Sequence, residues 1–182
     1  LMTSCHKQAQ QSQLDNEPSL VLSNHISNQK IKSISEDQYG QIWIGTFRGI
    51  NKYDGDKFHQ YFCTDDSLGL PDNNVTFTYR DSKKRLWIAT VNGVCWYNKQ
   101  GSFTRVRLPK DINKNIVSIL EDSKGHIFFF TVFELYQYDE KNNTITCKLR
   151  NLDKRRTYTV YSFIDKHDVL WICTPFSLNG YN

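Results

Sequence analysis

Four aspartates stand at equivalent positions of a repeated sequence, where their carboxyl groups could serve as general acids and bases. They are Asp37, Asp81, Asp122 and Asp165. A catalytic pair is needed once in a protein, whereas a turn aspartate is needed in every repeat, because its side chain accepts hydrogen bonds from the backbone that follows. The regular recurrence therefore favours turn residues, and we expect none of the four to be catalytic.

The histidines and cysteines form no pattern typical of a metal or nucleophile site. Neither HxxxH nor HExxH spacing occurs, and the five cysteines include no CxxC pair. A glycine-rich phosphate loop is also missing from the sequence. We expect no metal, no cofactor and no catalytic residue in this segment.

Residues that differ between the repeats are better candidates for a binding site. One turn reads FRG at 47–49, VNG at 91–93, VFE at 132–134 and PFS at 175–177. Equivalent turns gather at one end of a ring, and their mixture of donors, an acceptor and apolar faces suits a polar ligand. Each residue could also be an ordinary variable turn residue. The candidate ligand-binding residues are Arg48, Asn92, Phe133, Glu134 and Phe176.

These turns and aspartates belong to four copies of one sequence unit. The unit spans 31–53 and recurs at 75–97, 116–138 and 160–181, with a period of about 40–45 residues. An aspartate, an aromatic residue, a threonine and a tyrosine keep the same register in every copy. In chain order these anchors are Asp37, Trp43, Thr46 and Tyr53; Asp81, Trp87, Thr90 and Tyr97; Asp122, Phe128, Thr131 and Tyr138; and Asp165, Trp171, Thr174 and Tyr181.

Each unit predicts four short antiparallel strands, which in the first copy are 31–35, 42–46, 50–53 and 57–61. Four strands per about 40–50 residues, without the 3.6-residue apolar spacing of helices, are typical of a β-propeller blade. We predict an all-β propeller in which the tryptophan anchors form blade core rather than a sugar-binding surface. The blade repeats are about 31–61, 75–104, 116–147 and 160–182, the last one incomplete.

A propeller closes only when every blade meets a neighbour. Residues 20–22 could fasten the ring by adding a strand to the last blade. Four blades with an incomplete fourth are more consistent with the N-terminal part of a larger ring.

Composition excludes several classes of protein. The 182 residues are 38% hydrophobic, which is enough for a packed core. No apolar run approaches the ~20 residues of a membrane-spanning helix. The net charge of +4 is scattered, and we interpret the one dense basic run, between Lys148 and Arg156, as a solvated loop. We therefore expect no nucleic-acid binding.

Residues 1–18 are polar and lack apolar periodicity, so they predict a flexible tether ahead of a partial propeller at 19–182. The residues Leu1 to Cys5 resemble the end of a bacterial lipoprotein signal. Cys5 is then a candidate for lipidation, or it belongs to a terminus without a role.

The sequence resembles one known family. Asp37 to Thr46, Gly49 to Gly55, and Gly69 to Val75 are similar to the two-component regulator propeller repeat. The likeness covers residue 20 onward and is weaker in the third unit, where Phe128 replaces tryptophan and Glu134 replaces the turn glycine. Such repeats are typical of the periplasmic sensor regions of hybrid two-component systems in gut Bacteroidetes.

The resemblance implies a non-catalytic sensor region that recognises an oligosaccharide and feeds a phosphorelay. It also implies seven-bladed propellers, a stalk domain, a membrane helix and a histidine kinase on the same polypeptide, with homodimerisation of the full-length sensor as an option. Those parts would anchor the region in the periplasm, unless Cys5 carries a lipid anchor. Two alternatives stay open: an exported propeller glycosidase or lyase, and a surface lipoprotein scaffold with a protein partner.

Overall fold

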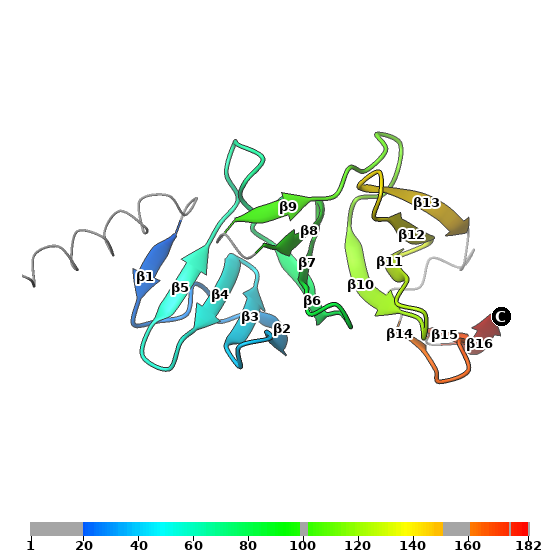
Figure 1. The fold of residues 1–182 in the computed structure, drawn as a ribbon, viewed down its shortest axis with the longest axis horizontal. Coiled ribbons are helices and arrows are strands. Elements are labelled where there is room, and N and C mark those ends of the chain that lie inside the picture. The colour runs from blue at the N-terminus through cyan, green and yellow to red at the C-terminus, as the bar shows by residue number, and fades with distance from the viewer. Residues whose placement is uncertain (1–19, 99–101, 151–160, 175, 182) are drawn as a thin grey trace, which may run out of the picture.

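The computed structural model describes residues 20–98, 102–150, 161–174 and 176–181. Within these ranges the chain forms sixteen β-strands and no helix, arranged as four antiparallel sheets. Figure 1 shows the sheets side by side in chain order. Because each sheet holds one sequence unit, the sheets are the blades of an all-β propeller, and we number them 1 to 4.

Blade 1 has five strands, blades 2 and 3 have four each, and blade 4 has three. Blade 1 contains β1 (Val21–Ser23), β2 (Ile31–Glu36), β3 (Ile42–Thr46), β4 (Gly49–Tyr53) and β5 (Phe58–Tyr61). Blade 2 contains β6 (Val75–Arg80), β7 (Leu86–Thr90), β8 (Gly93–Tyr97) and β9 (Phe103–Arg105). Blade 3 contains β10 (Ile116–Glu121), β11 (Ile127–Thr131), β12 (Leu135–Asp139) and β13 (Thr144–Leu149). Blade 4 contains β14 (Tyr161–Ile164), β15 (Leu170–Thr174) and β16 (Ser177–Tyr181).

The first strand of each repeat is the inner strand of its blade. Strand β2 contacts β6, β6 contacts β10, and β10 contacts β14, so the inner strands are neighbours across the blade junctions. The remaining strands follow outward by hairpins, in the order β6-β7-β8-β9 in blade 2. This arrangement puts every second hairpin turn at the same end of the blades.

The hydrophobic core lies between neighbouring blades. The ring of Trp43 lies 5.6 Å from that of Tyr61 in its own blade and 4.7 Å from that of Tyr97 in blade 2. Trp87 repeats this packing, 5.1 Å from Tyr138 of blade 3. Trp43 and Trp87 are fully buried, whereas Trp171, on the face of blade 4 that no described blade covers, is only partly buried.

The turn after each inner strand requires a residue with positive φ. Glycine fills this position in blades 1 and 3, with φ of 78° at Gly40 and 80° at Gly125. Lys84, at 66°, and Asp168, at 61°, take the same conformation in blades 2 and 4. A residue with a Cβ is strained there. The hydrogen bonds of the turn therefore hold these two residues in an unfavourable conformation.

The N-terminal strand does not lie where the sequence suggested. The sequence left open that residues 20–22 could add a strand to the last blade, but β1 pairs with β5 in blade 1, with Val21 opposite Gln60. The side chain of Gln60 also donates to the backbone oxygen of His25 at 2.7 Å. The free edge of β5 lies close in space to the chain that enters β2, so it captures this segment locally.

Some predicted features lie outside the described residues. These are the tether at 1–18 with Cys5, Val160 at the start of the fourth unit, Pro175 in its turn, and Asn182.

Replacing Lys84 by glycine is expected to raise the free energy of unfolding by about 0.5–1 kcal/mol, because glycine adopts positive φ without a Cβ clash. Urea unfolding followed by tryptophan fluorescence measures the change. Lys84→Ala removes the same charge and keeps the Cβ, so it serves as the control and should give no increase. An equal increase in both variants would show that charge, not backbone strain, is responsible.

Candidate functional site

Each aspartate anchor closes its own turn and holds an aromatic side chain. In blade 1, Asp37 Oδ1 accepts from the backbone amides of Tyr39, at 2.8 Å, and Gln41, at 3.0 Å. The other oxygen, Oδ2, accepts from the indole Nε1 of Trp43 at 2.9 Å. The aspartate is 6% exposed. Its carboxylate is therefore occupied by structure, as a turn residue would be.

The same contact recurs wherever the repeat keeps its tryptophan. The indole of Trp87 donates to Asp81 at 2.8 Å, and that of Trp171 donates to Asp165 at 2.9 Å. Blade 3 has Phe128 in this position, and phenylalanine has no N–H. There the Nδ1 atom of His126 lies 2.7 Å from Asp122 Oδ2 and takes the place of the indole.

Asp37→Ala is expected to lower the free energy of unfolding by about 2–4 kcal/mol, because it leaves the buried indole N–H of Trp43 without an acceptor. Asp122→Ala should cost only about 1 kcal/mol, because the side chain of His126 is 49% exposed and can bond to water. Urea unfolding of the two variants side by side measures the difference. Equal losses would contradict the importance of the buried indole contact.

The five predicted ligand-binding residues lie in turns between the second and third strands of the blades. Arg48 and Asn92 are exposed, Phe133 and Glu134 are partly buried, and Phe176 is 69% exposed. Threonine anchors shape these turns: Thr46 Oγ1 donates to the carbonyl of Gly49, and Thr90 Oγ1 to that of Gly93, both at 2.9 Å.

The side chains of Asn92 and Glu134 illustrate the surroundings of these turns. Asn92 lines a shallow recess of about 190 Å³ together with Pro71, Arg105 and Lys114. The carboxylate of Glu134 accepts a hydrogen bond from the Tyr136 hydroxyl. No described contact joins the five residues to one another, so a shared binding site at this end of the blades stays a prediction.

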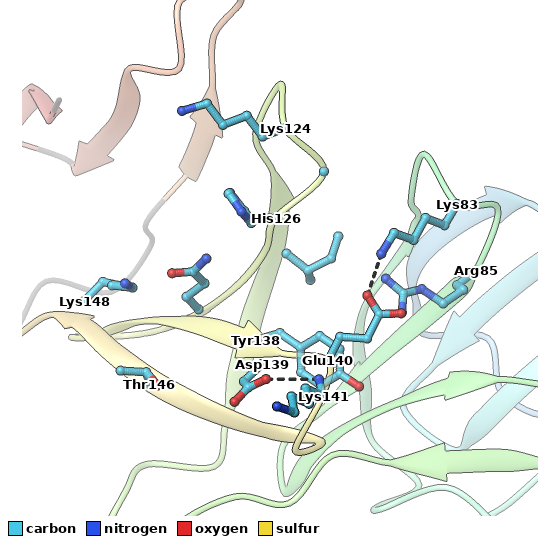
Figure 2. A pocket seen from close by; sticks show the side chains of 13 residues that line it. Lys83, Arg85, Lys124, His126, Tyr138, Asp139, Glu140, Lys141, Thr146 and Lys148 are labelled. Carbon is cyan, nitrogen blue, oxygen red and sulfur yellow. Dashed lines mark hydrogen bonds and ion pairs between the residues drawn. The ribbon is translucent and has the colours of Figure 1, made fainter.

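A larger recess lies at the other end of the blades. Hairpin turns alternate between the two ends of an antiparallel sheet, so the first and third turns, which line this recess, lie opposite the second turns. The recess has a volume of about 570 Å³ and lies between blades 2 and 3 (Figure 2). Basic side chains dominate its lining, with the two carboxylates of Asp139 and Glu140 among them. The basic residues are Lys83, Arg85, Lys124, His126, Lys141 and Lys148. We call this surface the basic recess.

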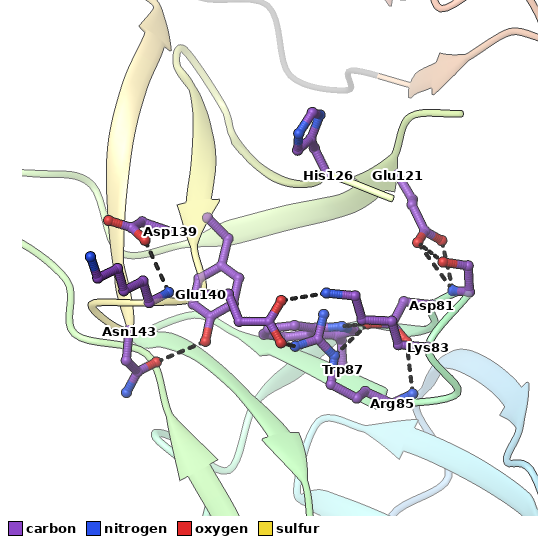
Figure 3. A network of polar contacts seen from close by, with 12 residues as sticks. Asp81, Lys83, Arg85, Trp87, Glu121, His126, Asp139, Glu140 and Asn143 are labelled. Atoms are coloured by element: carbon purple, nitrogen blue, oxygen red, sulfur yellow. Dashed lines mark hydrogen bonds and ion pairs between the residues drawn. The ribbon is translucent and has the colours of Figure 1, made fainter. Parts of the chain in front are cut away.

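A polar network fixes one side of the basic recess (Figure 3). Arg85 Nε donates to Asp81 at 2.6 Å, and its Nη1 donates to Glu140 at 2.8 Å. The guanidinium also lies 4.9 Å from the ring centre of Trp87. Lys83 Nζ donates to the second oxygen of Glu140 at 2.5 Å. These contacts join the first turn of blade 2 to the third turn of blade 3.

Two members of the network have shifted pKa values. The hydrogen bond from Lys83, together with the charge of Arg85, holds the pKa of Glu140 below its ordinary value. Burial raises the pKa of Tyr138, whose hydroxyl donates to Asn143 Oδ1 at 3.2 Å. Glu140 is therefore a carboxylate at neutral pH, committed to Lys83 and Arg85.

Three other lysines of the basic recess have no such neutralising contact. Among the described residues, no carboxylate forms an ion pair with the ammonium group of Lys124, Lys141 or Lys148. All three side chains are exposed. These three ammonium groups are therefore not held in place by a carboxylate of the described residues.

Sequence reasoning missed the basic recess. Lys148 was expected in a solvated loop, but it lies in β13, because 144–149 continues as the outer strand of blade 3. The recess could have been predicted from the charges of the two residues that stand two and four positions after each anchor aspartate. In chain order the pairs are Tyr39 and Gln41, Lys83 and Arg85, Lys124 and His126, and His167 and Val169. Only blades 2 and 3, which flank the recess, carry basic side chains at both positions.

Carboxylates on the inner strands would be the signature of an enzyme. Glu36 ends β2 and Glu121 ends β10, but blade 2, with Arg80 at the equivalent position, lies between them. Glu121 also accepts hydrogen bonds from the amide and hydroxyl of Ser82. Within the part of the chain that the structure describes, no group of three acidic, histidine or cysteine side chains could hold a metal ion. The described residues also contain no helix with the length and apolar character to cross a membrane.

A further carboxylate ties blade 3 to blade 4. Asp168 accepts from both the amide and the hydroxyl of Ser123, each at 2.7 Å. These hydrogen bonds hold the pKa of Asp168 below its ordinary value of 3.8. The contact is therefore fully formed at neutral pH and weakens in acid.

Stability is expected to decrease as the pH falls below about 4. A carboxylate whose folded pKa is depressed stabilises the protein above its unfolded pKa, and this contribution is lost as the pH drops through the folded value. Asp168→Asn should reduce this acid dependence, because asparagine also tolerates positive φ but does not ionise. Thermal unfolding midpoints between pH 7 and pH 3 measure the effect. Asp111→Asn, at an exposed loop position, is the control and should leave the acid dependence unchanged.

Two stretches of the sequence match a family model. Residues 25–48 and 69–92 match the two component regulator propeller. The matches cover the inner two strands of blades 1 and 2, where the resemblance noted from the residues is strongest, and they confirm it.

Solved structures similar to this chain share its fold. The extracellular domain of a hybrid two component system from B. thetaiotaomicron has a TM-score of 0.68 and 19% identity, over 90% of this chain and 30% of that one. The extracellular domain of a one component system from the same organism has a TM-score of 0.68 and 20% identity, over 88% and 22%. Virginiamycin B lyase from Staphylococcus aureus has a TM-score of 0.63 and 16% identity, over 90% and 59%.

The chain therefore spans less than a third of the first two structures and about three fifths of the third. A comparison with curated proteins found no match.

Proposed function

We propose that this chain is a non-catalytic, ligand-sensing region of an extracytoplasmic two-component sensor, and that its ligand is an oligosaccharide. Binding of the ligand would shift the arrangement of domains and so signal to a membrane histidine kinase outside this chain. The match to two-component regulator propeller repeats carries the proposal. The similarity in fold to extracellular domains of hybrid and one component systems is consistent with it.

The character of the recesses supports a polar ligand. The basic recess is lined by charged groups together with the amide of Gln137 and the hydroxyl of Thr146. A second recess, between blades 1 and 2, has the side chains of Gln38, Gln41 and Asn98 in its lining. Hydroxyl-rich ligands such as sugars form hydrogen bonds with such groups, whereas an apolar ligand would leave them unpaired.

Further blades of a larger, seven-bladed ring are the second part of the proposal. At the internal junctions a tryptophan of one blade packs on a tyrosine of the next, as Trp43 does on Tyr97. Trp171 on blade 4 meets Phe163 of its own blade, at 6.4 Å, and within the described ranges no tyrosine of another blade packs on it. On blade 1, Ile34 faces outward from β2 and is 63% exposed. Both outer faces are thus built to receive another blade.

Two other functions have weaker support. The support for an exported enzyme acting on glycans is the fold that the chain shares with virginiamycin B lyase. Against it, the carboxylates of the recurring aspartates already accept hydrogen bonds from turn amides and indoles. A surface lipoprotein scaffold would depend on Cys5, which lies outside the described residues.

Isothermal titration calorimetry of the chain against a panel of neutral and acidic oligosaccharides tests the proposed function. We expect saturable binding of at least one oligosaccharide, and chromatography of the mixture should recover that sugar unchanged. Absence of binding across the panel would contradict oligosaccharide sensing by this segment. Cleavage of a bound sugar would favour the enzyme instead.

A further inference from the structure

We infer that the basic recess between blades 2 and 3 binds an anionic saccharide, through a carboxylate or sulfate group on the sugar. The inference rests on the proposed function, for which it names the site and the chemical class of the ligand. It places this ligand at the opposite end of the blades from the turns that the sequence singled out.

The first support is unbalanced charge. Five side chains that are cationic at neutral pH line the recess, against the two carboxylates of Asp139 and Glu140 in the lining and that of Asp81, which pairs with Arg85. Glu140 is already shared between Lys83 and Arg85. Figure 2 shows the remaining lysines spread around the recess rather than on one side. Cations that face one hollow from several sides repel one another, and an anion placed among them relieves this repulsion.

The lysines without carboxylate partners come from three separate segments of blade 3. Lys124 lies in its first turn, Lys141 in its third turn, and Lys148 in the outer strand β13. Arg85, from blade 2, is fixed between Asp81 and Glu140 and is only 14% exposed at its side chain. The recess therefore combines one fixed guanidinium with three exposed lysines, whose long side chains can adjust around a ligand.

The charge is arranged differently at the other junctions. In the recess between blades 1 and 2, Tyr39 and Gln41 of blade 1 take the positions that Lys83 and Arg85 of blade 2 hold in the basic recess, so its cations, Lys52, Lys83, Lys84 and Arg85, come from one strand of blade 1 and the first turn of blade 2. The recess between blades 3 and 4 includes Ile164 and Leu170 and is more apolar. Lys83 and Arg85 tie blade 2 to blade 3 through Glu140, whereas Lys124, Lys141 and Lys148 form no ion pair among the described residues and are available to a ligand.

The size and lining of the recess suit a saccharide rather than a bare inorganic ion. A volume of about 570 Å³ falls in the range of about 300–1,000 Å³ found for small-molecule sites. Gln137 and Thr146 add an amide and a hydroxyl between the cations. These groups can bond to sugar hydroxyls, while the lysines neutralise the acidic substituent.

Calorimetry with matched probes tests the inference. The probes are trigalacturonate, chemically sulfated maltotriose, unmodified maltotriose and sodium sulfate. We expect one of the two acidic trisaccharides to bind, with an affinity that falls as sodium chloride is added. The double variant Lys124→Gln/Lys148→Gln should reduce that affinity about tenfold, because two exposed charge contacts are lost. Neither lysine forms an ion pair among the described residues, so the variant is expected to fold normally.

The matched control is Lys57→Gln/Lys166→Gln, which changes the net charge equally at two exposed positions outside the basic recess. It should bind with the affinity of the unaltered chain. An equal loss in the control, or no loss in Lys124→Gln/Lys148→Gln, would overturn the assignment of the site.

The other outcomes separate the inference from the proposed function. If unmodified maltotriose or another neutral sugar binds and both acidic sugars do not, the inference is wrong and oligosaccharide sensing stands. Sodium sulfate that binds as tightly as the acidic sugars would reduce the recess to a simple anion site and overturn the saccharide assignment. If none of the four probes binds, the inference is wrong, and the wider oligosaccharide panel decides the proposed function independently.

Discussion

The hydrogen bond between a turn carboxylate and the indole N–H six residues later organises every blade that keeps its tryptophan. One oxygen of the aspartate fixes the turn that follows the inner strand, and the other fixes the ring that packs on the next blade. A local turn and a contact between blades thus depend on a single buried side chain. The cost of leaving such a carboxylate or indole without its partner explains why the pair recurs in register.

Blade 3 shows how this constraint can be relaxed. Phe128 cannot donate a hydrogen bond, and His126 supplies a ring nitrogen to Asp122 instead. The exchange moves the donor from the core to the surface, where it borders the basic recess. A change that weakens the repeat pattern therefore brings an ionisable side chain to the lining of the basic recess.

Much of the fold could be predicted from the sequence because each strand and turn is encoded four times. The strand at 42–46 was predicted with the bounds that the structure shows, since its apolar run is enclosed by turn residues on both sides. Pairing of β1 with β5 could not be predicted, because it depends on which edge lies nearest in space. The basic recess was missed for a similar reason: Lys83 and Lys148 are far apart in the chain and meet only when blades 2 and 3 are stacked.

The added strand β1 has a consequence for how the molecule meets other proteins. The outer edge of a sheet exposes unpaired backbone groups, which can recruit strands from other chains. In blade 1 the four-residue edge of β5 is covered, and the new edge is only three residues long. So short an edge offers few hydrogen bonds to an incoming strand. The outer edge of blade 1 is thereby protected from the edge-to-edge aggregation to which open β-sheets are prone.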